Sequence, residues 1–82
     1  MNTITLLFFA TLKDAAGTRR MELEIEEGTT VNGLRGSLGS RIPGLAAALP
    51  SALVAINKEF AFPEQVIPPG AEVALFPPVS GG

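Results

Sequence analysis

The 82-residue sequence contains no cysteine, histidine, tryptophan or tyrosine. Without cysteine the chain can form no disulfide, thiolate nucleophile, persulfide or cysteine-bound iron–sulfur cluster, and without histidine it can form no Ser-His-Asp triad. A zinc site would have to consist of carboxylates alone, which is not how such sites are normally built. We therefore expect no bound metal. The groups left for chemistry are scattered carboxylates, a few lysines and arginines, and the chain end.

Charge is also scarce. Charged residues make up 17% of the sequence against 46% hydrophobic residues, a balance that favours a folded chain over a disordered one. The formal net charge of -2 gives no positive excess to neutralise phosphates, so nucleic acid is not an expected partner. Arg19 and Arg20 form the one basic pair, which we interpret as a solvated strand edge without a function.

Long hydrophobic runs are missing. The longest ones, residues 6–10 and 45–49, are far shorter than the ~20 residues that cross a bilayer, so no membrane span is expected. The first residues lack the positive cluster and the long apolar region of a signal peptide, which predicts a cytoplasmic location. The length fits one domain with one small core.

The first half of the sequence predicts two strands and a loop. Residues 4–10 are almost continuously apolar, which is typical of a central strand buried on most of both faces. Residues 12–18 should form a loop around Gly17. Apolar residues then alternate with glutamates, as in a half-buried strand with a solvated acidic face: Met21, Leu23 and Ile25 with Glu22, Glu24 and Glu26.

One amphipathic helix should follow the turn at Glu27-Gly28, with Thr29 or Thr30 as its N-cap. Its apolar stripe consists of Val31, Leu34, Leu38 and Ile42. Three glycines lie on the opposite side, Gly33, Gly36 and Gly39, and each costs roughly 0.8–1.0 kcal/mol relative to alanine. Their spacing matches neither phosphate-binding glycine motif, so we expect no nucleotide loop.

The second half of the sequence predicts short strands punctuated by turns. Pro43-Gly44 should end the helix, and residues 45–49 can form one more short turn. The expected strands are residues 53–56, a short segment at 60–62, and residues 72–76, with turns at 57–59 and 68–70. This order predicts an α+β domain in which one helix covers one face of a mixed sheet and the other face is bare.

The last six residues are Pro77, Pro78, Val79, Ser80, Gly81 and Gly82. The prolines favour an extended exit from the last strand, and two residues without a Cβ give a thin end that can enter a narrow channel of another protein. A carboxylate there would react only after a partner enzyme had used ATP to form an acyl-adenylate. A frayed, inert end is the alternative interpretation.

Residues 76–82, Phe-Pro-Pro-Val-Ser-Gly-Gly, closely resemble the end of the small, sulfur-carrying subunits of molybdopterin synthase. The resemblance continues at residues 7–10, 30–31, 34–35, 55–57 and 70–74. It implies a β-grasp, ubiquitin-like domain at residues 1–76 and an extended tail at residues 77–82. The three helix glycines and Pro68-Pro69 depart from the family pattern.

The resemblance also implies a mechanism. In that family an adenylating enzyme activates the terminal glycine with ATP, and sulfur transfer converts it to a thiocarboxylate. The large synthase subunit then uses this sulfur to make the dithiolene of molybdopterin from precursor Z. Here that glycine is Gly82. The chain would bind no cofactor and would not be an enzyme by itself, because the catalytic residues are expected on the large subunit, in an assembly of two small and two large subunits.

The resemblance further implies an apolar partner-binding surface of Phe9, Phe60 and Phe76, with residues 77–82 entering the partner. Core packing is the alternative for Phe9 and Phe76. Three other functions stay open: a sulfur carrier of the thiamine pathway, a ubiquitin-like protein modifier joined to lysines through Gly82, and a plain interaction domain with an inert tail.

Overall fold

Residues 1–78 are described by the structure, a computed structural model, so that Val79, Ser80, Gly81 and Gly82 lie outside the described residues. The elements in chain order are β1 (Asn2–Phe8), α1 (Thr11–Ala16), β2 (Arg20–Ile25), α2 (Val31–Arg41), the 3₁₀ turns η1 (Pro43–Leu45) and η2 (Leu49–Ser51), β3 (Leu53–Ile56), β4 (Glu59–Phe60) and β5 (Glu72–Phe76).

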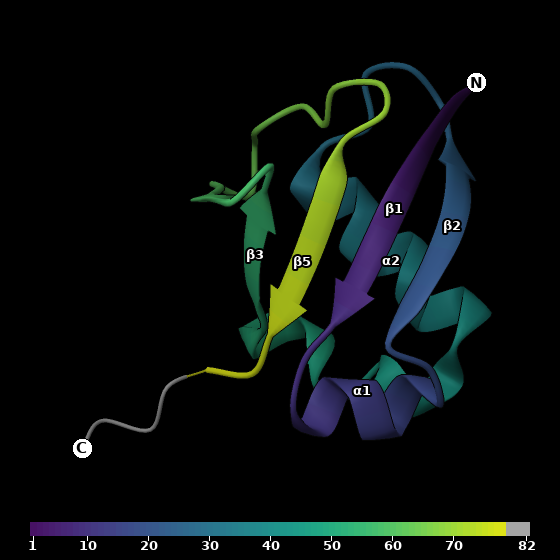
Figure 1. Cartoon of the computed structure of the whole chain (residues 1–82), viewed down its shortest axis with the longest axis vertical. Helices are drawn as coiled ribbons and strands as arrows, with labels where there is room; N and C mark the ends of the chain where they lie inside the picture. Colours follow the sequence, from purple (N-terminus) through teal and green to yellow (C-terminus); the bar gives the residue numbers. More distant parts are fainter. Residues whose placement is uncertain (79–82) are drawn as a thin grey trace.

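The strands form one mixed sheet in the order β2-β1-β5-β3-β4. β1 and β5 are parallel neighbours, whereas the pairs β1–β2, β3–β5 and β3–β4 are antiparallel. The two parallel strands therefore end at the same end of the sheet, beside α1 (Figure 1). The predicted α+β class and the mixed sheet are confirmed.

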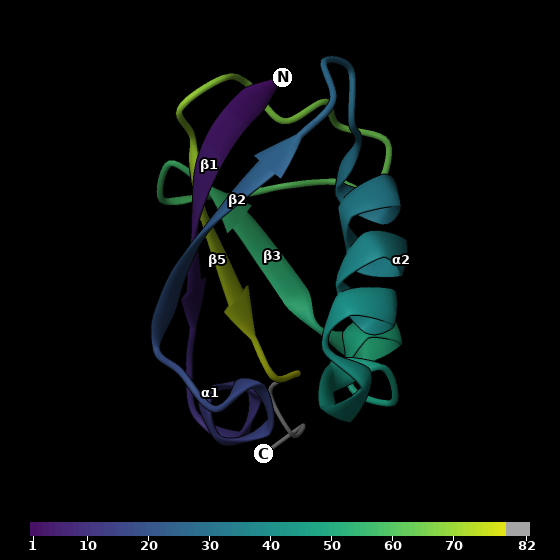
Figure 2. The same ribbon diagram turned by 90° about the vertical axis from the view of Figure 1, so that its right-hand side faces the viewer.

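Helix α2 covers one face of this sheet (Figure 2). It begins where the Thr30 hydroxyl accepts a hydrogen bond from the Gly33 backbone N–H at 3.1 Å, which confirms one of the two predicted caps. The predicted stripe is confirmed as well, since Val31, Leu34 and Leu38 are buried against the sheet. Ile42, the last member of the stripe, is half-buried just after the helix end.

The core between sheet and helix is entirely apolar among the described residues. Its largest fully buried side chains are Phe8, Ile4, Leu6, Leu12, Leu34, Leu38, Leu45, Ile67, Leu75, Val31 and Val73. Each stabilises the fold by roughly 1.5–3 kcal/mol relative to an exposed position. The hydrophobic effect of this layer is what holds the weak, glycine-rich helix in place.

The prediction that β1 is buried on both faces is wrong. Burial alternates along this strand, so that Phe8 faces the core while Leu7 is half-buried and Thr3 is exposed. The reason is that β1 is an interior strand whose packed layer, within residues 1–78, lies only on the α2 side (Figure 2). The apolar run therefore leaves apolar side chains on the open face of the sheet.

The loop predicted at residues 12–18 is also wrong, because residues 11–16 form the short helix α1. It follows Ala10, whose φ is 53°, and no side chain caps its start. It ends at Gly17, which has a left-handed φ of 76° and donates its N–H to the Lys13 carbonyl at 3.0 Å. Leu12 is the buried residue of α1, and its side chain packs this short helix against the core.

The remaining predicted elements need smaller corrections. The short turn predicted at residues 45–49 is confirmed, since the Ala48 N–H donates to the Leu45 carbonyl at 2.9 Å, and the 3₁₀ turns η1 and η2 flank it. Residues 53–56 and 72–76 form β3 and β5 with the predicted bounds. The segment expected at 60–62 is the two-residue strand β4, Glu59–Phe60, because the turn needs only Asn57 and Lys58, both with positive φ. No helix within residues 1–78 is long and apolar enough to cross a membrane.

Candidate functional site

The parallel pair β1 and β5 brings two phenylalanines together at one end of the sheet. Phe8 lies opposite Leu75 in the register, and the next residue, Phe9, donates its backbone N–H to the Leu75 carbonyl at 3.2 Å. Phe76, the last residue of β5, consequently lies next to Phe9 although the two are far apart in the sequence. Non-local strand pairing, rather than any local motif, builds this site.

The rings of these residues are in contact with one another. Phe9 and Phe76 stack with centroids 4.6 Å apart and planes 12° from parallel. Phe60 approaches Phe76 from β4 with centroids 6.3 Å apart and a tilt of 59°. Both arrangements fall within the distances at which aromatic pairs attract each other. We call Phe9, Phe60 and Phe76 the aromatic patch.

The aromatic patch lies on the molecular surface rather than in the core. The exposed fraction is 73% for Phe60 and 42% for Phe9, against 1% for the adjacent core residue Phe8. Phe76 is half-buried beneath its two neighbours. Core packing therefore does not explain Phe9 or Phe76, and the three residues that the resemblance singled out do come together.

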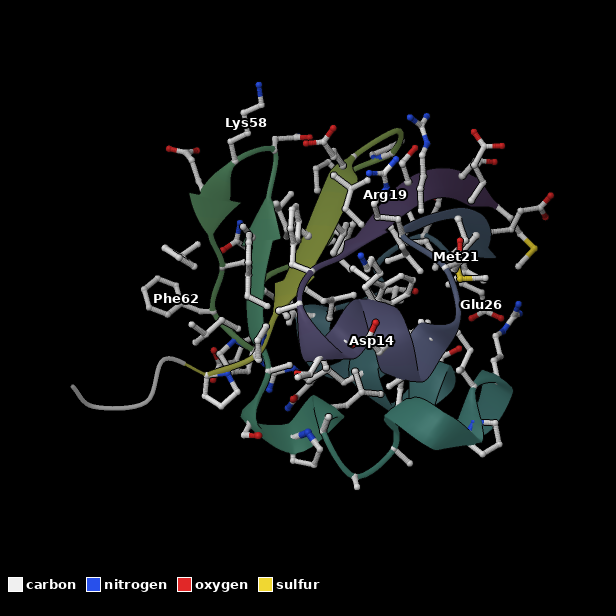
Figure 3. All side chains as sticks on the ribbon, turned by 60° about the horizontal axis from the view of Figure 1, so that its bottom comes forward. Asp14, Arg19, Met21, Glu26, Lys58 and Phe62 are labelled. Atoms are coloured by element: carbon white, nitrogen blue, oxygen red, sulfur yellow. The ribbon has the colours of Figure 1, made fainter. Side chains whose placement is uncertain are left out.

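Two further apolar residues near this surface were not anticipated from the sequence. Leu53 lies directly opposite Phe76 in the β3–β5 register and is 37% exposed. Phe62 is 74% exposed and projects from the edge of the sheet (Figure 3). Because β4 ends at Phe60, strand periodicity gives no signal for the position of Phe62.

The chain leaves β5 directly from the aromatic patch. Pro77 is half-buried, Pro78 is exposed, and neither belongs to a strand. Proline cannot donate to a sheet ladder, which explains why β5 ends at Phe76. The predicted residues Val79, Ser80, Gly81 and Gly82 lie outside the described part of the chain, so their role stays a prediction.

Polar groups are sparse inside the described part of the chain. No polar or charged side chain is buried among residues 1–78. Within the same range, no group of three or more acidic side chains could hold a metal ion. An exposed aromatic surface of this kind can seat a protein partner.

Together, a mixed sheet covered by one helix and an apolar patch at the root of a C-terminal segment define a ubiquitin-like β-grasp protein. Residues 6–82 match the ThiS family, and the chain belongs to that family. The match includes β5 and the residues after it.

Individual relatives agree with this assignment. A molybdopterin synthase sulfur carrier subunit from Haemophilus influenzae is 35% identical, over 96% of this chain and 99% of the relative. One from Mycobacterium tuberculosis is 32% identical over 100% of both chains. Among solved structures, small archaeal modifier protein 1 from H. volcanii is similar with a TM-score of 0.86, at 26% identity, over 96% of this chain and 100% of that one.

Proposed function

We propose that this chain is the sulfur carrier subunit of a molybdopterin synthase and that it works through the carboxylate of Gly82. The observation that carries the proposal is the full-length similarity to two proteins of that name, at 35% and 32% identity. In the M. tuberculosis relative the aligned region spans 100% of both chains, so Gly81 and Gly82 lie inside it. The exposed aromatic patch at the root of the tail supports the proposal, because such a carrier needs a surface on which its partner can dock.

The proposed chemistry starts with activation of the Gly82 carboxylate. A carboxylate is a poor acyl donor, so its oxygen attacks the α-phosphate of ATP on a separate adenylating enzyme and pyrophosphate leaves. A sulfur nucleophile then attacks the acyl carbon of this adenylate and displaces AMP, which leaves a thiocarboxylate. The large synthase subunit uses that sulfur to convert precursor Z to molybdopterin. Two carriers supply the two sulfurs of each dithiolene.

Within this proposal the chain has two functional parts. Residues 1–76 form the domain that presents the aromatic patch, and residues 77–82 form the tail that enters the large subunit. The chain itself binds no cofactor, and ATP is a substrate of the activating enzyme. We further propose an assembly of two small and two large subunits in the cytoplasm.

Deletion of Gly82 tests the proposed function, because one glycine adds almost no apolar area to an interface. The shortened chain should still bind the large subunit with nearly unchanged affinity, measured by calorimetry. It should yield no molybdopterin from precursor Z after incubation with the activating enzyme, ATP and a sulfur donor. Product formation by the shortened chain would overturn the assignment of the sulfur to Gly82.

A second candidate function is that of a protein modifier, and the similarity to small archaeal modifier protein 1 favours it. In that case a lysine amine, rather than sulfur, would displace AMP from the adenylated Gly82 and form an isopeptide bond. Incubation with the activating enzyme, ATP and a lysine-bearing protein distinguishes the two. A covalent conjugate that resists thiol and hydroxylamine would establish the modifier function, whereas a thiocarboxylate that forms without conjugates favours the sulfur carrier.

A further inference from the structure

A groove with a basic rim adjoins the aromatic patch. Its volume is ≈ 490 Å³, and its floor consists of residues 7–10, the end of β1 and the turn into α1. Its charged residues are Lys13, Arg19 and Arg20. Phe9 lines this groove and also stacks on Phe76, so the groove and the aromatic patch form one continuous surface.

The charge of this groove contrasts with that of the whole chain. Three of the six basic residues lie here, while the formal net charge of the chain is -2. No carboxylate is among the described residues that line the groove, and Asp14 lies in an adjoining hollow with Lys13 and Arg19. The three cationic side chains are exposed. Three cationic side chains therefore border the apolar surface, whereas Glu22 and Glu72, which both lie opposite Thr5 in the strand register, are outside the groove.

Strand pairing and α1 place these cations together. Arg20 lies directly opposite Leu7 in the β1–β2 register, which puts its side chain on the open face of the sheet. Arg19 accepts the Phe8 N–H with its backbone carbonyl at 2.9 Å, and its side chain lies on the side of the sheet away from α2 (Figure 3). Lys13 reaches the groove from α1.

We propose that this groove receives a carboxylate-bearing segment of the protein partner that docks on the aromatic patch. The proposal rests on the proposed function, because the partner is the large synthase subunit. An apolar floor beside two guanidinium groups and one ammonium group matches the aliphatic stem and charged head of Asp and Glu side chains. Helix α1 starts beside the groove, but it has only six residues, and the backbone N–H groups of Leu12 and Lys13 are already bonded to the carbonyls of Phe9 and Ala10. This start offers little to a phosphate, which favours a protein segment as the occupant.

The expected role of the groove is to steer association. Charges on the rim of an interface raise the association rate through long-range attraction and contribute less to the lifetime of the complex. The rate should therefore fall with rising ionic strength, because the Debye length shrinks from ~10 Å at 0.1 M to ~3 Å at 1 M salt. The stacked rings, by contrast, should govern dissociation.

Stopped-flow association with the large subunit tests the proposal in the full chain. The double variant Arg19→Gln/Arg20→Gln should associate about tenfold more slowly than wild type at low salt, and the two rates should converge near 1 M NaCl. Arg41→Gln and Arg41→Gln/Lys58→Gln serve as controls that remove one and two charges. Arg41 is exposed at the end of α2 and Lys58 at the tip of the β3–β4 turn, and neither lines the groove. Both controls should keep more of the wild-type rate than the groove variant.

The outcomes separate the two proposals. In one outcome, wild type associates with the large subunit, and the groove variant and the double control associate more slowly by the same factor. In another, both variants associate at the wild-type rate. Either result overturns the groove proposal while the proposed function stands. The same conclusion follows if the groove variant loses binding of inorganic phosphate, added as a probe, but associates at the wild-type rate. If wild type does not associate with a large subunit that does bind a related sulfur carrier in the same experiment, both proposals are withdrawn. Unchanged circular dichroism and melting of the variants exclude loss of folding as the cause.

Discussion

Phe9 and Phe76 stack face to face at a centroid distance of 4.6 Å, although one follows β1 and the other ends β5. The parallel pairing of these strands aligns the two rings, and the half-buried Phe76 serves as the base on which Phe9 and Phe60 rest. The stack therefore belongs both to the fold and to the surface that we assign to partner binding. Its contributions to stability and to binding can be tested separately.

The stack should contribute to stability beyond the area it buries. We expect a coupling free energy of about 0.5–1.5 kcal/mol between positions 9 and 76 in a double-mutant cycle of Phe9→Leu and Phe76→Leu. Urea unfolding of wild type, both single variants and the double variant gives this value. Strictly additive losses would show that the rings are neighbours without a stabilising interaction.

Phe60 should act as a binding anchor with little effect on folding, because 73% of it is exposed. We expect Phe60→Ala to weaken calorimetric affinity for the large subunit by about 1–3 kcal/mol, and high carrier concentration to restore molybdopterin yield. Val66→Ala is the matched control, because Val66 is also an exposed apolar residue, with an exposed fraction of 52%. It pairs with Thr30 at the start of α2 and does not belong to the aromatic patch. Equal losses in both variants would contradict a specific patch.

Gly36 should be replaceable with a gain in stability. It is exposed within α2, and an added Cβ would meet no atom within 4 Å. Gly36→Ala should therefore raise the free energy of unfolding by up to about 1 kcal/mol.

Gly70→Ala provides the contrast in the same urea experiment. Gly70 also has open space around it, but its φ of +71° should make the alanine variant less stable by roughly 1–2 kcal/mol. Opposite signs for the two variants are expected. A loss in both would mean that α2 does not tolerate a side chain at position 36.

The Thr30 cap should be worth about 1 kcal/mol, because its hydroxyl is the side-chain acceptor for the Gly33 N–H at the start of a glycine-rich helix. Thr30→Ala should lower the free energy of unfolding by that amount. Thr30→Ser keeps the hydroxyl and should recover most of it. Equal destabilisation by serine and alanine would assign the effect to the lost methyl group instead of the cap.

Much of the fold could be predicted from local patterns. The apolar stripe of α2, the Thr30 cap and the bounds of β3 and β5 follow from periodicity, capping and turn chemistry. Helix α1 could not be found this way, because six residues are too short for a helical period and only Leu12 is buried. The one-sided burial of β1 could not be predicted, because an apolar sequence does not reveal how many layers cover a sheet.

The site was only partly accessible from the sequence. The resemblance singled out Phe9, Phe60 and Phe76, but their contacts depend on strand pairings between distant residues. The basic pair Arg19-Arg20 does lie at a solvated strand edge, as predicted, because β2 is an edge strand of the sheet. Its position beside Phe9 and Lys13 follows from the β1–β2 pairing and from α1, neither of which a local pattern discloses.

The central claim is that the Gly82 carboxylate becomes a thiocarboxylate. Intact-mass spectrometry after incubation with the activating enzyme, ATP and a sulfur donor measures this directly, and fragmentation locates the change. We expect one oxygen to be replaced by sulfur at Gly82, only when ATP is present. An unchanged mass, with an enzyme that thiolates a related carrier under the same conditions, would contradict the account.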